Sequence, residues 1–244
     1  MLIAYIMLAV LISGLLGLTG GLLLLYREKR ARKYSPFLVS YAAGALFSAA
    51  FLGLIPEMVE INVSQAAFAS ILGGIIIFFV LERFLSWYHH HMGNARVPIF
   101  NYMIIIGDTV HNFIDGVIIA AAFIADFALG VTTTLAVLLH EVPQEIGDFG
   151  VLLHGRMKRK SIIFYNVLSA LVALAGAAIA YFFLLAIEGA LPFFIGIAAG
   201  GFIYIAGTDL IPETRKERKL KPSILHAIIF LIGILTIWLA GLLV

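Results

Sequence analysis

The chain has 244 residues, of which 62% are hydrophobic and 12% are charged, and its formal net charge is +2. Soluble domains are about half apolar and about a quarter charged, so this composition excludes a soluble globular protein and any sizeable soluble catalytic domain. The chain has no cysteine, which also excludes disulfides and thiolate metal sites. Because a membrane-spanning helix needs about 20 apolar residues, the sequence predicts an all-α membrane protein.

Eight apolar segments follow one another along the chain. The first lacks a basic start and a small-residue cleavage site, so it is expected to be a span and not a signal peptide. The connections are short, which predicts a single polytopic membrane domain over residues 1–244. The predicted spans are about 1–26, 34–56, 66–88, 98–125, 130–153, 162–187, 191–212 and 222–244.

The basic residues are distributed unevenly between the connections. All 16 Lys and Arg lie in, or at the edges of, the first, third, fifth and seventh connections. By the positive-inside rule, these connections are cytoplasmic and both termini are outside. This pattern predicts a multi-pass protein of a cell membrane, either plasma or bacterial inner membrane. The basic clusters are explained as topology anchors, so nucleic-acid binding is not expected.

The second and seventh spans share a sequence pattern. Residues 42–57 read AAGALFSAAFLGLIPE and residues 198–213 read AAGGFIYIAGTDLIPE. In the predicted topology one of these spans runs outward and the other inward. We therefore expect an inverted repeat of spans 1–3 and 6–8 around spans 4 and 5, a construction common among secondary transporters. The alternative is shared helix-packing and helix-end chemistry.

Polar residues recur along one face of each of the two central spans, 98–125 and 130–153. In the first they are spaced i, i+3, i+4 and i+7, and in the second i, i+1, i+4, i+5 and i+8, so each set forms a stripe. The residues are Asp108, His111, Asn112 and Asp115 in the first span, and His140, Glu141, Gln144, Glu145 and Asp148 in the second.

Five of these stripe residues are acids, and neither span contains Lys or Arg. A charge at the centre of a spanning helix costs about 2.5–3.5 kcal/mol even on insertion scales. Protons, water or a metal cation must therefore compensate the carboxylates. Two His with carboxylates and side-chain amides suit a borderline divalent ion such as Zn²⁺, Fe²⁺, Mn²⁺ or Co²⁺. The alternative is a polar seam in which the stripes only hydrogen-bond to each other.

Two motifs in these spans resemble those of the ZIP (Zrt/Irt-like) family of divalent-metal transporters. Residues 111–116 read HNFIDG, against the family's HNFxDG, and residues 140–148 read HEVPQEIGD, similar to the HExPHExGD of one branch. The resemblance implies eight spans, external termini, a homodimer and a binuclear site at mid-membrane. It assigns His111, Asp115, His140 and Gln144 to the first metal position, and Asn112, Asp115 and Glu141 to the second.

The sequence departs from the family at two positions. Gln144 stands where relatives carry His or Glu, which weakens the ligand field of the first metal position. Gly53 stands where many relatives have His, at the outer end of the second span.

Further polar residues are candidates for the ion pathway. Three consecutive His in the third connection form a possible metal-collecting site on the cytoplasmic side, or simply an exposed polar loop. For the lone polar residues in spans 6 and 7, helix packing or capping is the alternative. The pathway candidates are Asp108, Glu145, Asp148, Asn166 and Asp209, and the collecting candidates are His89, His90 and His91.

The predicted function is transport of divalent transition metals into the cytoplasm through the site between spans 4 and 5. Zn²⁺ is the expected main substrate, with Fe²⁺, Mn²⁺, Co²⁺ and Cd²⁺ as further candidates and no prosthetic group. The alternative is a proton- or cation-coupled carrier of a small organic solute, which would not need the paired His. No enzyme activity is expected, because Gln144 replaces the second His of a zinc-protease HExxH motif.

Overall fold

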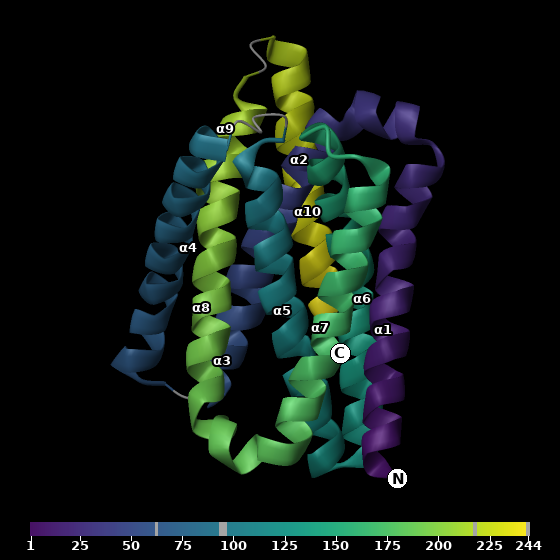
Figure 1. Ribbon diagram of the computed structural model, residues 1–244, viewed down its shortest axis with the longest axis vertical. Coiled ribbons are helices and arrows are strands. Elements are labelled where there is room, and N and C mark those ends of the chain that lie inside the picture. The colour runs from purple at the N-terminus through teal and green to yellow at the C-terminus, as the bar shows by residue number, and fades with distance from the viewer. Residues whose placement is uncertain (62, 93–96, 217–218, 243–244) are drawn as a thin grey trace.

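The computed structural model describes residues 1–61, 63–92, 97–216 and 219–242, with the backbone alone for 88–92 and 184–188. All regular elements in these ranges are helices, and the long ones run side by side as a bundle (Figure 1). In chain order they are α1 (Leu2–Tyr26), α2 (Glu28–Ser48), the π-helical segment η1 (Ala49–Leu54), α3 (Ile55–Ile61), α4 (Gln65–Met92), α5 (Ile99–Ala125), α6 (Phe127–His154), α7 (Arg159–Ile187), the 3₁₀ turn η2 (Glu188–Ala190), α8 (Leu191–Tyr204), the π-helical segment η3 (Ile205–Leu210), α9 (Ile211–Thr214) and α10 (Leu220–Leu242).

The predicted class, an all-helical membrane protein, is confirmed. Within the described ranges, seven helical segments are long and apolar enough to cross a membrane. Two of them are composite, because α2, η1 and α3 follow one another without a break, as do α8, η3 and α9. The eighth predicted span is α6, which is as long as its neighbours but more polar, since it carries three acids.

Helices α2, α6 and α7 begin three or more residues earlier than the sequence predicts. The second span starts at Glu28 and not near residue 34, because the basic run that precedes it is helical too. Lys and Arg are good helix formers although they lower hydropathy. Helix α6 starts at Phe127, where the Asp126 carboxylate accepts a hydrogen bond of 3.0 Å from the Leu129 amide and caps the first turn.

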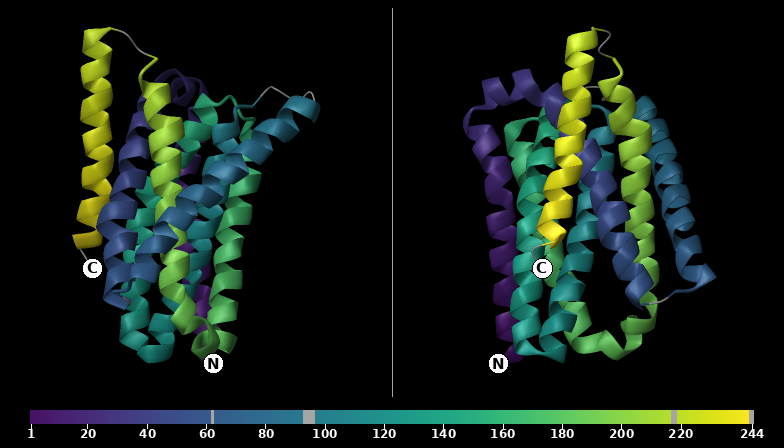
Figure 2. Two further views of the ribbon diagram at one scale, coloured as in Figure 1. Left: turned by 90° about the vertical axis from the view of Figure 1, so that its left-hand side faces the viewer. Right: turned by 180° about the vertical axis from the view of Figure 1, so that it is seen from behind.

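Successive connections lie at alternate ends of the bundle. The joins α1–α2, α6–α7 and α9–α10 lie at one end, and the joins α5–α6 and α7–α8 lie at the other, together with the N-terminus (Figure 2). The basic runs of the sequence thus gather at a single end, which we call the basic end. This is the arrangement that the alternation of charged and uncharged connections predicts.

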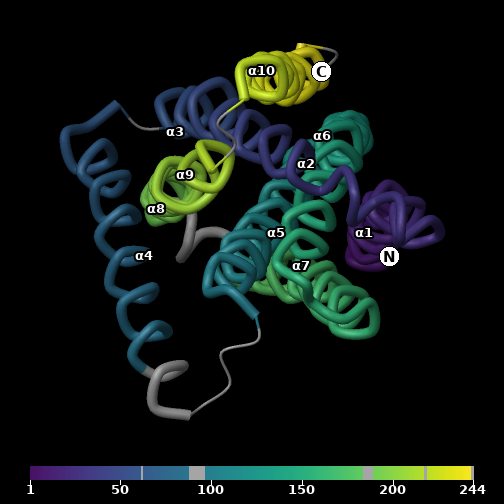
Figure 3. Tube along the Cα trace, turned by 90° about the horizontal axis from the view of Figure 1, so that it is seen from above, coloured from purple at the N-terminus to yellow at the C-terminus, as the bar shows by residue number. Residues whose placement is uncertain are grey.

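Helix α5 lies at the centre of the bundle, as the view along the helices shows (Figure 3). Its most apolar stretch is 67% buried, against 11% for the corresponding stretch of α4 at the periphery. The helices pair in the same way in the two halves of the chain. Helix α1 packs on α6 and, equivalently, α7 packs on α5. Helix α10 packs on α2 and, equivalently, α4 packs on α8.

Glycines make the closest of these contacts. A Cβ atom on Gly44 of α2 would collide with the carbonyl oxygen of Phe230 in α10, and one on Gly233 would collide with that of Tyr41. Only glycine therefore allows the backbones of α2 and α10 to approach this closely.

The α4–α8 pair repeats this pattern of contacts. A Cβ on Gly200 would meet the carbonyl oxygen of Ile71, and one on Gly74 would meet that of Ile197. Aligned on the shared AAG and LIPE motifs, Gly200 corresponds to Gly44 and Ile197 to Tyr41. The same two contacts thus hold the equivalent helices of both halves together.

The two π-helical segments also coincide in this alignment. Each ends two residues before the proline of LIPE, Pro56 in one case and Pro212 in the other. Proline has no N–H, so the carbonyl one turn earlier loses its helical donor. Helix α2 runs away from the basic end and α8 runs toward it (Figure 1). The chain therefore contains an inverted repeat, with α1–α4 and α7–α10 on either side of α5 and α6.

Two neighbouring glycines of α4 test the close approach of its backbone to α8. We expect Gly74→Ala to lower the melting temperature of the purified protein, because overpacking a tight contact costs about 1–3 kcal/mol. The matched control is Gly73→Ala, where a Cβ has nothing within 4 Å and alanine favours the helix. Equal melting temperatures for the two variants would refute the glycine-mediated contact.

Candidate metal centre

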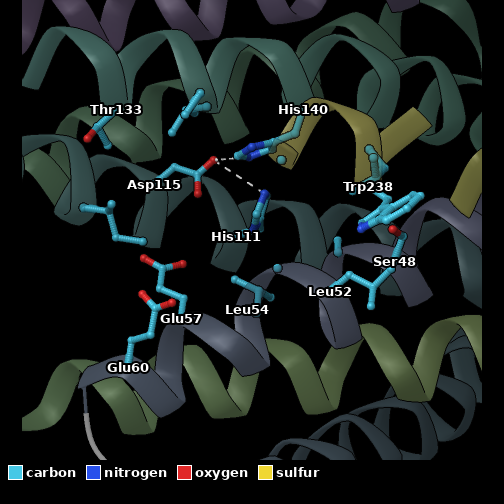
Figure 4. A pocket seen from close by; sticks show the side chains of 17 residues that line it. Ser48, Leu52, Leu54, Glu57, Glu60, His111, Asp115, Thr133, His140 and Trp238 are labelled. Carbon is cyan, nitrogen blue, oxygen red and sulfur yellow. Dashed lines mark hydrogen bonds and ion pairs between the residues drawn. The ribbon is translucent and has the colours of Figure 1, made fainter. Parts of the chain in front are cut away.

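Four acidic and imidazole side chains meet between α5 and α6. They are His111 and Asp115 of α5, and His140 and Glu141 of α6, and one ligand atom from each lies within 4.8 Å of all the others. Asp115 Oδ2 lies 3.5 Å from His111 Nε2 and 3.4 Å from His140 Nε2 (Figure 4). His111 Nε2 lies 3.7 Å from Glu141 Oε1. We call these four residues the ligand cluster.

Each side chain of the cluster is placed by its helix. His111 and Asp115 are one turn apart and so share a face of α5. His140 and Glu141 are consecutive on α6, and they reach the cluster from two different directions. Phe202 of α8 packs on the His111 ring, with centroids 5.2 Å apart, which orients the imidazole.

Helix α1 approaches the cluster closely at a glycine. A Cβ on Gly17 would stand 3.2 Å from the Cβ of Glu141, which is a tight contact. A larger side chain here would press on Glu141, so the small residue helps to keep the carboxylate in place.

The spacing of the cluster fits a tetrahedral metal site. With bonds of about 2.1 Å, the ligand atoms of tetrahedral zinc stand about 3.4 Å apart, and the three separations given above are close to that value. His111, Asp115 and Glu141 are nearly fully buried. Both His111 ring nitrogens and Glu141 Oε1 make no hydrogen bond to any described residue. Such buried polar atoms are costly unless they gain a partner, and a cation would supply one.

A pocket of about 450 Å³ leads to the cluster from the end opposite the basic end. His111, Asp115 and His140 form its inner wall, and Glu57 and Glu60 of α3 form its acidic rim (Figure 4). Neither of these two acids is predicted from the sequence as a site residue. The only signal was the repeated LIPE motif, which places Glu57 just past the π-helical segment.

The predicted residues Asn112 and Asp108 lie on the other side of the cluster and are bonded to each other. The Asn112 amide donates to Asp108 Oδ1 at 2.9 Å and to Ser169 Oγ of α7 at 3.2 Å. Ser169 was not predicted from the sequence. Neither Asn112 nor Asp108 lines the pocket, so they extend the polar stripe beyond it.

Three further stripe residues of α6, Gln144, Glu145 and Asp148, are buried and do not line the pocket. Both amide atoms of Gln144 and Glu145 Oε2 make no hydrogen bond to any described residue. They continue the unpartnered polar surface from the ligand cluster toward the basic end.

The remaining candidates do not join the cluster. Asn166 is buried in α7, and its amide donates to the Ile162 carbonyl of its own helix at 2.7 Å. Asp209 lies in the π-helical segment η3 and is not one of the four clustered residues. His89, His90 and His91 lie outside the residues whose side chains the structure describes.

The chain is similar to proteins named zinc transporters. Zinc transporter ZIP10 of Danio rerio is 42% identical over 122 residues, which are 50% of this chain and 14% of that protein. Zinc transporter ZIP4 of Homo sapiens is 39% identical over 140 residues, 56% of this chain and 21% of that protein. The aligned part of this chain thus covers no more than about a fifth of these longer relatives.

The family model described as "ZIP Zinc transporter" matches residues 92–241, which include both motifs and all four residues of the ligand cluster. This match covers more than half of the chain. The chain therefore belongs to the ZIP family.

Proposed function

We propose that this protein carries divalent transition-metal ions into the cytoplasm, with Zn²⁺ as its main substrate. The observation that carries the proposal is the ligand cluster, in which two imidazoles and two carboxylates converge at the inner end of an open pocket. The similarity to proteins named zinc transporters supports zinc. An organic-solute carrier is not favoured, because it has no need for the paired His.

The pocket supplies the route of entry. The carboxylates of Glu57 and Glu60 raise the local concentration of cations at its mouth. An ion that reaches the inner wall exchanges water for the side chains of His111, Asp115 and His140. Since imidazole and carboxyl groups bind metals in their deprotonated forms, binding displaces any protons that they hold.

We propose two adjacent metal positions. His111, Asp115, His140 and Gln144 form the first, Asn112, Asp115 and Glu141 form the second, and Asp115 bridges them. In support, Asp115 lies centrally in the cluster and Glu141 approaches it from the side of α1. Use of Asn112 requires its amide to turn away from Asp108, so that the side-chain oxygen faces the ion.

Exit toward the basic end requires a movement. Beyond the cluster the polar stripe continues through the buried side chains Asp108, Glu145 and Asp148. We propose that the two repeats rock against α5 and α6 and open this stripe to the cytoplasm, as in other inverted-repeat transporters. Asn166 and Asp209 belong to this inner half, and His89–His91 would collect ions there.

The orientation of the protein and its membrane are inferred from the distribution of basic residues and from the resemblance to the family. We place the basic end in the cytoplasm and both termini outside, in the plasma membrane or bacterial inner membrane. The chain is proposed to act as one polytopic domain and to assemble as a homodimer.

Loss of a central ligand tests the site. We expect His111→Ala to reduce Zn²⁺ uptake into proteoliposomes by at least about tenfold, since even outer-shell changes at metal sites reach that size. Thr109→Ala is the control, because that hydroxyl bonds only to its own helix. Equal uptake by both variants, from folded protein, would rule out the ligand cluster as the transport site.

The acidic rim of the pocket should help the protein to capture Zn²⁺ ions from solution. The double variant Glu57→Gln/Glu60→Gln is expected to raise the KM for Zn²⁺ while the maximal rate changes little, because long-range attraction governs encounter. The effect should weaken at high salt. Glu28→Gln, at the opposite end, serves as the control, and an unchanged KM in the double variant would contradict this route of entry.

Gln144 should influence metal preference. Replacing it by His adds a stronger nitrogen ligand to the first position, so Gln144→His is expected to favour Zn²⁺ over Mn²⁺ in competition uptake. Fe²⁺, Co²⁺ and Cd²⁺ complete the comparison. An unchanged order of competition would remove Gln144 from the first metal position.

A further inference from the structure

A second cavity lies between α2, α9 and α10, near the basic end. Its volume is about 410 Å³. Arg215, Thr214 and Ser223 stand at the level where α9 ends and α10 begins. The apolar residues Ala227 and Phe230 lie further along α10, and Phe230 is about 10 Å from the level of Ser223 at 1.5 Å per residue. The cavity is therefore polar at its outer end and apolar toward the membrane interior.

Arg215 gives the outer end a positive charge. Its side chain is exposed and makes no ion pair with any described residue, whereas the adjacent Lys216 pairs with Glu213. The planar guanidinium of Arg presents several donors that match phosphate oxygens. The hydroxyls of Thr214 and Ser223 lie beside it. They donate to the carbonyls of Ile211 and Lys219, so each would have to turn in order to donate to a bound anion.

The wall of the cavity holds a fixed imidazole. His226 Nδ1 lies 2.6 Å from Ser40 Oγ, and the ring packs on Phe37 with centroids 4.7 Å apart. These contacts hold the His226 ring in place between α2 and α10, where it and Ser40 add polar groups to the wall of the cavity.

The inverted repeat shows that the fold itself does not need this polarity. Aligned on LIPE, Thr214 corresponds to Met58 and Arg215 to Val59. Met58 is fully buried, and its sulfur would stand 3.1 Å from a Cβ on Gly196, the counterpart of Ser40, with the Ser70 hydroxyl nearer still. The equivalent region of the other half is thus closely packed, and the positions that match Thr214 and Arg215 are apolar.

We propose that this cavity binds an anionic phospholipid of the leaflet at the basic end. Its phosphate lies against Arg215 and the hydroxyls of Thr214 and Ser223, and the first part of an acyl chain lies along Ala227 and Phe230. Basic pockets between membrane helices on the cytoplasmic side are suited to such headgroups. The apolar depth distinguishes a lipid from a free phosphate ion, which would use the outer end alone.

The test uses the full-length chain purified in detergent, with dioleoylphosphatidylglycerol as the probe. Binding is followed by native mass spectrometry and by the melting temperature, since a ligand of the folded state stabilises it. Dioleoylphosphatidylcholine and inorganic phosphate are the comparison ligands. The variants are Arg215→Gln, which removes the charge, and Ala227→Leu, which fills the apolar part. Arg159→Gln, an exposed basic residue of the same end outside the cavity, is the control.

We expect phosphatidylglycerol to bind and stabilise the unmodified protein and Arg159→Gln, with little effect of the comparison ligands. Arg215→Gln should weaken that binding by about tenfold, as expected for loss of one charge-assisted hydrogen-bonding group. Ala227→Leu should weaken it while the charge is intact. Equal binding by Arg215→Gln and Arg159→Gln would overturn the proposal. Stabilisation by inorganic phosphate that is unaffected in Ala227→Leu would show a small-anion site and overturn the lipid assignment.

Discussion

The central constraint on this protein is the burial of five carboxyl groups in two helices that contain no Lys or Arg. Asp108, Asp115, Glu141, Glu145 and Asp148 are each only 2–4% exposed. In lipid such groups need compensation from hydrogen bonds, protons or a cation. The Asp108 carboxylate accepts a hydrogen bond from the Asn112 amide, and the Asp115 carboxylate lies beside the imidazoles of His111 and His140. Glu141 Oε1 and Glu145 Oε2 make no hydrogen bond to any described residue, so hydrogen bonds within the described part of the chain leave these two carboxyl groups uncompensated.

The rest of the fold arranges these two helices and shields them. Helix α5 sits at the centre, and the reciprocal pairing of α1 with α6 and of α7 with α5 covers both polar helices from equivalent sides. Glycines allow the outer helices to come close enough for this cover, since lipid provides no hydrophobic driving force between helices and close packing must replace it. Helices α5 and α6 are antiparallel, so their polar stripes lie side by side and run in opposite directions.

The two halves of the repeat have diverged where the first half borders the pocket. Ser48 and Gly53 line the open pocket, and their counterparts in the second half are Tyr204 and Asp209. Tyr204 is bulkier and donates a hydrogen bond of 2.6 Å to Glu82 of α4. The pocket thus lies beside the small residues of the first half, whereas the equivalent positions of the second half carry larger polar side chains. Arg215 and His226 line a separate cavity, which shares no lining residue with this pocket.

The sequence by itself determined the class of the protein, the stripes and the family. Hydropathy, the placement of Lys and Arg, and helical spacing are local properties, and they were enough to place His111 with Asp115 and His140 with Glu141. Only the tertiary structure decided which atoms meet. The acids Glu57 and Glu60 reach the pocket because the π-helical segment η1 and α3 pack on α8, and Ser169 meets Asn112 because α7 packs on α5. Periodicity fixes the face of one helix, but the depth and rotation at which another helix meets that face depend on close packing along the whole contact.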